Sequence, residues 1–432
     1  MAMNDQLRQE IVELIHREVV LATGCTEPGA VALSVARAKE TLGCEPDRIT
    51  LLLSKNVFKN AMGVGIPGTG MIGLPIAVAM AVTAGDSSRL LDVLNIEENQ
   101  IDAAKAWLEQ HSGAIDIQVA NDCDKLYIDC RMGAGADHAR AVISGRHTRF
   151  VLVERNGKQL EVDYPQQRVD EATATPFCLT SFAQVYEFAL TTPIEQLQFI
   201  NETVRYNEAA SAEGLKGYGL FAGRILMDNA SGDIVHTVVA HSVAASDARM
   251  DGCTLPVYSN SGSGNQGITC TLPVYKYGTM KGCSNEQITR ALILSHLTSI
   301  YVKYGIGRLS ALCGIVNASI GVATGLVYLQ GGDYTQTSYA IKNLINTIAG
   351  MVCDGAKPSC ALKMATGLYS AFVASELACH NHVVDETDGL SENDIDNSIA
   401  NLGRLGHDGM DQTDDMVLDI MTHKKLCGNT TA

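Results

Sequence analysis

The sequence has few aromatic residues and few basic ones. Phe, Trp and Tyr make up only 5% of its 432 residues, whereas Gly occurs 40 times. A core with so few rings is expected to consist of close-packed helices with small residues at their contacts. Lys and Arg number 32 against 48 Asp and Glu, which gives a net charge of −16. Because an acidic chain repels phosphate backbones, we expect no nucleic-acid partner.

The N-terminus lacks the basic segment and following apolar segment of a secretory signal peptide. The chain nevertheless contains 13 cysteines. Without an export signal these cysteines are better interpreted as thiols in a reducing compartment than as disulfides. We therefore expect a cytoplasmic protein.

Two segments without charged residues, 61–85 and 309–332, are long enough to span a bilayer. Both contain several glycines and polar residues, and the first includes the turn 67–70. The unpaired backbone groups of such a turn would be unfavourable in lipid. We therefore expect buried helices around an internal site, and no membrane partner.

Hydrophobic patterning predicts an α+β fold with a mainly helical catalytic domain and a smaller insertion built on an antiparallel sheet. Apolar residues at helical spacing predict a first helix within residues 5–21, and a second helix is expected at 29–42. Residues 48–53 read as a strand. Alternating and β-branched runs from about residue 115 to 162 predict the antiparallel sheet, and Asn156-Gly157 predicts a hairpin turn within it.

These elements suggest three parts. We expect an N-terminal helical part at 1–112, a β-rich insertion at 113–190 whose end the sequence does not fix, and a C-terminal helical part at 191–432 that carries the metal ligands. The two helical parts are expected to pack together as one catalytic unit.

Three cysteines are candidate metal ligands. Cys353 and Cys360 flank a segment with Gly and Pro, and such a loop can turn both sulfurs toward one centre. Cys313 lies forty positions before Cys353, in a helical segment that could pack alongside. Three thiolates suit either zinc or an iron–sulfur cluster. For each cysteine alone, the alternative is a small buried hydrophobe.

The two kinds of metal site differ in what they leave open. A structural zinc site needs four protein ligands, and no fourth ligand is obvious in the sequence. A cubane cluster on three cysteines would leave one iron free to act as a Lewis acid on a substrate oxygen or sulfur. The spacing of the cysteines does not choose between these metals.

Cys25 is a candidate for the chemistry itself. It follows Gly24, which breaks the first helix, and precedes or begins the second. Thr26 is expected to cap that helix, and Glu27 lies in its first turn. Free N–H groups there could stabilise a Cys25 thiolate and lower its pKa, or bind a substrate carboxylate. A buried cysteine beside a tight turn is the alternative interpretation.

Three segments rich in small and polar residues are typical of cradles for a small ligand: 66–70, 244–249 and 259–267. The last matches G-x-G-x-x-G, but no strand–turn–helix crossover surrounds it, so a dinucleotide site is rejected. Their donors and acceptors suit the ammonium and carboxylate of an amino acid, although ordinary turns share this composition. The candidate substrate-binding residues are Thr26 and Glu27 beside Cys25 and, in these segments, Gly68, Thr69, Gly70, Ser259, Asn260, Ser261, Gly262, Ser263, Asn265 and Gln266.

With these motifs together, the chain resembles the L-cysteine desulfidase family (UPF0597), which is related to the alpha subunit of iron–sulfur L-serine dehydratases. The resemblance runs from about residue 6 to 421. The segments that carry it are 24–28, 67–71, 244–250, 259–269, 309–313, 351–362, 398–402 and 410–414.

The resemblance implies a [4Fe–4S] cluster held by Cys313, Cys353 and Cys360, with the fourth iron open. It implies a lyase that converts L-cysteine to pyruvate, ammonia and hydrogen sulfide without pyridoxal phosphate, with Cys25 as base or nucleophile. L-Serine is the alternative substrate. A non-catalytic iron–sulfur or zinc protein is the alternative from another class.

Cys427 lies in a short C-terminal tail. Some related dehydratases place a C-terminal cysteine on the free iron, which makes Cys427 a hypothetical further ligand. A tail without such a role is the alternative. The sequence leaves the oligomeric state open, a homodimer included.

Overall fold

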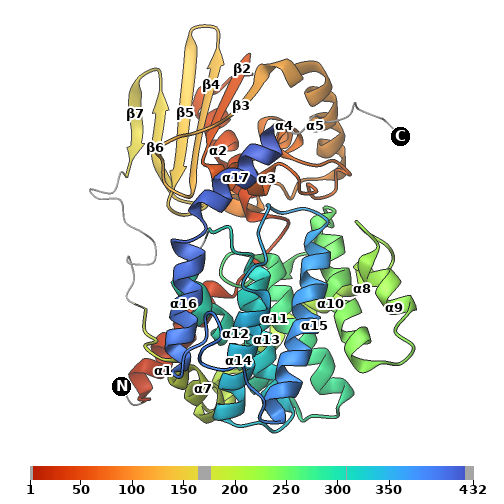
Figure 1. Cartoon of the computed structure of the whole chain (residues 1–432). Coiled ribbons are helices and arrows are strands. Elements are labelled where there is room, and N and C mark those ends of the chain that lie inside the picture. Colours follow the sequence, from red (N-terminus) through yellow and green to blue (C-terminus); the bar gives the residue numbers. More distant parts are fainter. Residues whose placement is uncertain (1–2, 164–176, 308, 424–432) are drawn as a thin grey trace.

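Two large hydrophobic cores organise the part of the chain that the structure describes, residues 3–163, 177–307 and 309–423. The structure is a computed structural model. One core lies between a β-sheet and its covering helices, in the upper part of Figure 1, and we call this part the α/β unit. The other core lies within the bundle of helices below it, which we call the helical unit.

The sheet of the α/β unit has the strand order β3-β2-β4-β5-β6-β7. Its neighbouring strands are antiparallel, except that β2 and β3 are parallel. The strands are β2 (Arg48–Leu53), β3 (Ile115–Val119), β4 (Tyr127–Ala134), β5 (Asp137–Ser144), β6 (Phe150–Arg155) and β7 (Lys158–Val162).

Two expectations about this sheet need correction. The sheet is mixed, because the chain passes through several helices between β2 and β3, and such a crossover allows parallel pairing. It also includes β2, which lies outside the range 113–190. The alternating pattern predicts the individual strands, but it does not indicate which strand pairs with which. The α+β fold class is confirmed.

Helices cover the sheet on its buried face. The Ala/Val-rich α2 packs against β4 and β5, and the Ser34 hydroxyl donates to the carbonyl of Ala141 at 2.9 Å. The uncharged α4 packs between α2 and α5 and is almost entirely buried, as expected. The helices are α2 (Thr26–Leu42), α3 (Lys55–Ala61), α4 (Leu74–Ala84) and α5 (Glu98–His111), with short 3₁₀ helices η1 (Ser87–Asp92) and η2 (Ser112–Ala114).

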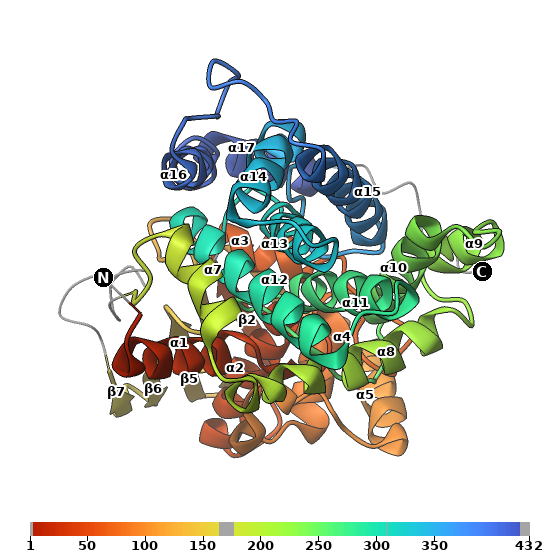
Figure 2. The same cartoon turned by 90° about the horizontal axis from the view of Figure 1, so that it is seen from below.

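The helical unit surrounds α13, which Figure 2 shows near its centre. Nearly every residue of α13 is buried against α11, α12, α14 and α15. A Cβ on Gly321 would lie 2.2 Å from the Ser295 carbonyl oxygen, so a glycine is needed where α12 and α13 meet. No helix among the described residues is long and apolar enough to cross a membrane.

In the sequence, some helices of this unit precede the strands of the sheet and the others follow them. They are α1 (Asp5–Glu18), α7 (Phe182–Thr191), α8 (Glu202–Gly214), α9 (Ala222–Asp228), α10 (Ile234–Met250), α11 (Gly264–Met280), α12 (Asn285–Ile306), α13 (Gly314–Leu329), α14 (Tyr334–Ile348), α15 (Cys360–Cys379) and α16 (Ile395–His407), with η3 (Ile194–Gln196) and η4 (Gln198–Asn201).

Two features tie the units together. The short strand β1 (Leu21–Ala22), between α1 and α2, pairs antiparallel with β8 (Val257–Tyr258). The last helix, α17 (Asp411–Thr422), leaves the helical unit and packs on α3 of the α/β unit (Figure 1). At that contact Lys59, which is only 2% exposed, forms an ion pair with Asp414.

We predict that Asp414→Ala destabilises the protein by about 3–5 kcal/mol, because it leaves the Lys59 ammonium buried and unpaired. The matched control is Asp415→Ala, which removes the neighbouring but solvent-exposed ion pair with Lys55 and should change stability by less than about 1 kcal/mol. Urea unfolding followed by circular dichroism measures both. Equal effects of the two substitutions would contradict the prediction.

Candidate active site

The three predicted metal ligands lie where the ends of two helices meet a loop. An isolated antiparallel bridge pairs Leu312 with Val352. As part of this contact, the Cys313 amide donates to the Met351 carbonyl at 2.9 Å, and the Cys353 amide donates to the Ala311 carbonyl at 2.7 Å. The bridge thus places two cysteines that are forty positions apart in the sequence side by side in the fold.

Cys360 joins this pair from the other end of the loop. Residues 353–360, here called the cysteine loop, end at Cys360, the first residue of α15. Its thiol donates to the Gly355 carbonyl at 3.6 Å. Cys313 is the N-cap of α13. Two helix N-termini, each with a partial positive charge, therefore lie beside the sulfurs and favour anionic ligands there.

The three thiols are close enough to affect one another. Burial raises the pKa of Cys313 to about 12, and the neighbouring Cys353 and Cys360 raise it further. Burial also raises the pKa of Cys360, with Cys353 again contributing. In this state the Cys313 and Cys360 thiols hold their protons, so metal binding here would release them.

A lysine supplies positive charge beside the cysteines. The Lys363 ammonium donates to the Val352 carbonyl at 2.9 Å and pairs with Asp354. Burial alone would lower the pKa of Lys363, but the hydrogen bond to Asp354 and the neighbouring Cys313 outweigh it, so the pKa is raised. Lys363 is therefore a cation throughout the physiological pH range, and its charge favours negative charge on the nearby sulfurs.

The spacing of these ligands bears on the choice of metal. Among the described residues, no three or more His, Cys, Asp or Glu side chains are placed to hold a metal ion. A single zinc ion binds each thiolate at about 2.3 Å, so its ligand sulfurs must crowd around one point. A four-iron cluster instead takes each cysteine on a different iron, which separates the sulfurs. A cluster would therefore need a wider separation of the three sulfurs than one zinc ion would, and three thiolates as a donor set fit either.

Cys25 lies on the other side of the site as the N-cap of α2, a position that we expected Thr26 to occupy. The turn before it has Gly24 at φ +67°, and a Cβ there would lie 2.8 Å from the Pro67 side chain. The loop after Pro67 therefore packs directly on the turn. Cys360 is one of the groups that influence the Cys25 thiol, which shows that the turn and the cysteine loop are neighbours.

The environment of Cys25 overturns the expectation of a lowered pKa. Burial raises the pKa of its thiol to about 12, Arg249 opposes this effect, and Glu27 adds to it. The thiol donates to Glu27 Oε2 at 3.7 Å, and the Thr26 hydroxyl donates to the same oxygen at 3.0 Å. The helix N-terminus is present, but the loss of hydration dominates.

The segment 259–267, here called the glycine loop, connects Cys25 to the cysteine ligands. Its start is fixed where the Ser259 amide and hydroxyl both donate to the Val20 carbonyl at 2.8 Å. Thr26 donates to the Gly262 carbonyl at 3.3 Å, and Ser263 begins α11 as its N-cap. At its other end, Gln266 lies against Gly314, the residue after Cys313.

Buried polar side chains hold the glycine loop in place. Asn317 of α13 donates to Gln266 Oε1 at 2.7 Å. Asn260 bonds to the ring of His296 at 3.1 Å, and the other ring nitrogen of His296 bonds to Thr271 at 3.0 Å. Burial lowers the pKa of His296 to about 3, so this ring stays neutral. Ser261 donates to Asn260, which completes the set.

A cavity of about 890 Å³ lies between the two units and reaches part of this site. Four of the predicted substrate-binding residues line it: Thr26, Ser259, Ser261 and Gly262. Its walls contain Arg17, Lys125, Arg146 and Lys303 together with Glu18, Asp92 and Asp124, so charged groups of both signs line it. A cavity of this volume is ample for an amino acid.

The other predicted residues are placed differently. Gly68, Thr69 and Gly70 do not line the cavity among the described residues. The Thr69 hydroxyl is used within its own turn, where it donates to the Ile66 carbonyl at 2.8 Å and accepts from the Met71 amide at 2.9 Å. This loop therefore supports the Cys25 turn. Cys427 lies outside the described residues.

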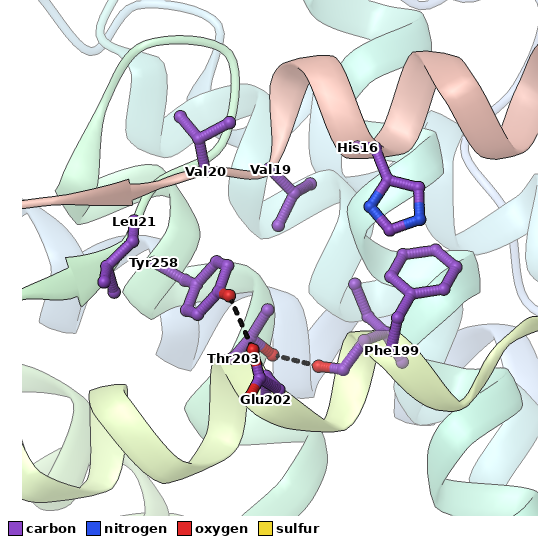
Figure 3. A pocket seen from close by; sticks show the side chains of 9 residues that line it. His16, Val19, Val20, Leu21, Phe199, Glu202, Thr203 and Tyr258 are labelled. Carbon is purple, nitrogen blue, oxygen red and sulfur yellow. Dashed lines mark hydrogen bonds between the residues drawn. The ribbon is translucent and has the colours of Figure 1, made fainter.

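A second cavity of about 320 Å³ lies on the ribbon formed by β1 and β8 (Figure 3). It shares Val20 and Leu21 with the larger cavity. His16 and Phe199 lie ring against ring on one side, and the Tyr258 hydroxyl donates to Glu202 on the other. None of the predicted site residues lines this cavity in the described part of the chain, so it is not the candidate active site.

Sequence reasoning missed several residues of the site. In the sequence, Arg249 is only the end of a segment of small and polar residues. In the structure its side chain donates hydrogen bonds to Gly24 and Asn265 and acts electrostatically on Cys25. Asn60 was not considered, and it donates to Glu27 Oε1 at 3.1 Å. The signal for Arg249 was a cation in an otherwise largely uncharged helix, α10.

Comparison with known proteins identifies the family. The family model for the serine dehydratase alpha chain matches residues 71–419, which include all three candidate metal ligands. This chain belongs to that family. The serine dehydratase alpha chain is part of a lyase, so an enzyme of this type is indicated.

Relatives cover nearly the whole chain. A UPF0597 protein of Bacteroides fragilis is 46% identical over 429 residues, which is 98% of this chain and 100% of the relative. A UPF0597 protein of Phocaeicola vulgatus is 47% identical over 426 residues, covering 97% and 98%. One from Oleidesulfovibrio alaskensis is 43% identical over 421 residues, covering 96% and 98%.

We predict that Gly355→Ala displaces the cysteine loop. Gly355 has φ +92°, and a Cβ there would lie 2.1 Å from the Lys59 carbonyl oxygen. The strained backbone alone should destabilise by about 1–3 kcal/mol. Gly350→Ala is the matched control, because no atom lies within 4 Å of the added Cβ. Thermal unfolding and the rate of thiol labelling at Cys353 and Cys360 should change in the first variant only, and unchanged labelling in Gly355→Ala would refute the prediction.

Proposed function

We propose that this chain is an iron–sulfur-dependent lyase that eliminates the β-substituent of a small amino acid, with L-cysteine as substrate and pyruvate, ammonia and hydrogen sulfide as products. One observation carries the proposal. Cys313 and Cys360 stand at the starts of two helices, the bridge between Leu312 and Val352 brings Cys353 beside Cys313, and Cys25 at the start of α2 is close enough to Cys360 for the two thiols to interact. Membership of the serine dehydratase alpha chain family supports elimination as the reaction class.

The donor set supports a [4Fe–4S] cluster on these three cysteines. Two helix N-termini and the Lys363 ammonium favour the negative charge of a thiolate-bound cluster. Gly355 and Gly314 keep the backbone close to Lys59 and Gln266 around the ligands. When bound through three cysteines, the cluster would offer one iron as a Lewis acid to the leaving group.

Cys25 is proposed to transfer the proton from the substrate α-carbon. A thiol whose pKa is about 12 acts as a base at neutral pH only if a nearby positive charge favours its thiolate. Arg249, which lowers the pKa of this thiol, supplies that charge, and Glu27 Oε2 orients the thiol by accepting its hydrogen bond. The Thr26 hydroxyl on the same oxygen fixes the direction of the carboxylate.

The glycine loop is proposed to orient the substrate. It contacts the Cys25 turn at Gly262 and the Cys313 helix at Gln266, so a substrate held by it lies between the two. Orientation of this kind contributes strongly to rate, and small displacements lower it. The cavity beside Ser259 and Ser261 gives the aminoacrylate product a route to water, where it tautomerises and hydrolyses to pyruvate and ammonia.

L-Serine is the second candidate substrate, and the family match favours it. The two reactions share α-proton removal and differ in whether sulfide or hydroxide leaves. An anaerobic assay of the reconstituted protein with each amino acid decides between them. We expect sulfide and pyruvate in equal amounts from L-cysteine, at a kcat/KM above that for pyruvate from L-serine. Faster turnover of L-serine would replace the first candidate with the second, and no product from either would reject the lyase.

Iron content separates a catalytic cluster from incidental metal. We predict that Cys353→Ala loses most bound iron after anaerobic reconstitution and loses sulfide production with it, because two cysteines hold a cluster poorly. Cys283→Ala is the control, since Cys283 lies far from the cysteine loop, with its thiol directed to the Leu329 carbonyl. Sulfide release that persists after iron removal would rule out the proposed mechanism.

A further inference from the structure

The site contains a buried cation whose hydrogen bonds in the described structure all go to neutral groups. Arg249 is 5% exposed. Its Nη2 donates to the Gly24 carbonyl at 2.9 Å, and Nη1 donates to Asn265 Oδ1 at 3.3 Å. Its Nε is buried without a hydrogen-bond partner among the described residues. A buried guanidinium normally pairs with a carboxylate or phosphate, because the loss of hydration is otherwise uncompensated.

A buried carboxylate nearby likewise has hydrogen bonds only to neutral groups among the described residues. Glu27 is 7% exposed. Its oxygens accept from the Asn60 amide at 3.1 Å, the Thr26 hydroxyl at 3.0 Å and the Cys25 thiol at 3.7 Å. All three donors are neutral. The structure therefore gives Glu27 a defined orientation but, within its described residues, no positive partner.

Both charges lie next to Cys25. Glu27 accepts the hydrogen bond of its thiol and raises the thiol pKa, whereas Arg249, which donates to the carbonyl of the preceding Gly24, lowers it. Neither forms an ion pair with the other. Two opposite charges that their own hydrogen bonds keep from pairing match a ligand whose α-carbon bears both an ammonium group and a carboxylate group.

We propose that Arg249 binds the carboxylate and Glu27 binds the ammonium of an α-amino acid zwitterion. This inference rests on the proposed function and adds the orientation of the substrate. With its charges so placed, the α-carbon lies against the Cys25 thiol, which is the group assigned to proton transfer. The start of α11 at Gly264 and Asn265 adds favourable backbone N–H dipoles on the carboxylate side.

The clamp also predicts selectivity. A ligand that lacks one charge leaves the opposite protein charge buried and unpaired, which weakens binding strongly. Amino acid amides, N-acylated amino acids and residues within peptides should therefore be excluded. Amino acids with a free ammonium and a free carboxylate should bind even when their side chain has no leaving group.

Equilibrium dialysis of the anaerobic holoenzyme with radiolabelled L-alanine, propionate and ethylamine tests the proposal. L-Alanine has both charges and no leaving group, so binding is measured without turnover. Arg249→Met should weaken the binding of L-alanine and of propionate by about tenfold or more and leave the binding of ethylamine unchanged. Glu27→Gln should weaken the binding of L-alanine and of ethylamine to a similar degree and leave the binding of propionate unchanged. The surface substitution Arg224→Met is the control.

The proposal is overturned if either variant affects propionate and ethylamine equally, or if the folded wild type fails to bind L-alanine. Because Arg249→Met could misfold, wild-type protein supplies an independent test. L-Alaninamide and N-acetyl-L-alanine should each bind about tenfold or more weaker than L-alanine, and equal binding would also overturn it. These measurements need no sulfide or pyruvate, so the clamp and the lyase activity succeed or fail separately.

Discussion

The bridge between Leu312 and Val352 is the constraint on which the site depends. It joins the start of the most buried helix, α13, to the beginning of the cysteine loop. Since α13 is enclosed by α11, α12, α14 and α15, its N-terminus has little freedom to move. Cys313 is fixed by this packing, and Cys353 is fixed relative to Cys313 by two backbone hydrogen bonds. The packing of α13 and the bridge thus set the positions of Cys313 and Cys353, and Cys360 is placed where the cysteine loop enters α15.

Burial shapes the chemistry of the site more than any single contact does. It keeps the thiols of Cys25 and Cys313 protonated and the ring of His296 neutral. The low dielectric of the same environment strengthens the electrostatic interactions of the charged side chains that remain. Arg249, Glu27 and Lys363 therefore interact with neighbouring groups more strongly than they would in water. A substrate that enters with its own charges is therefore oriented by few residues.

The sequence predicted the parts of this site that depend on local patterns. Glycine and proline around Cys353 and Cys360 indicated a loop, and the break at Gly24 indicated a helix start at Cys25, both of which the structure contains. It did not predict the parallel pairing of β2 with β3 or the position of Arg249, because both depend on contacts between distant segments. It also misjudged the Cys25 pKa, since composition near a helix start does not reveal how completely the rest of the fold removes water.

The position of α17 has a consequence for the order in which the protein matures. This helix is among the last described segments of the chain, and its Asp414 neutralises Lys59, whose carbonyl contacts Gly355 in the cysteine loop. A nascent chain lacks this counter-charge until Asp414 has been synthesised, which is later than Cys313, Cys353 and Cys360. The cysteine loop is therefore expected to gain its full support from Lys59 only when α17 docks on α3.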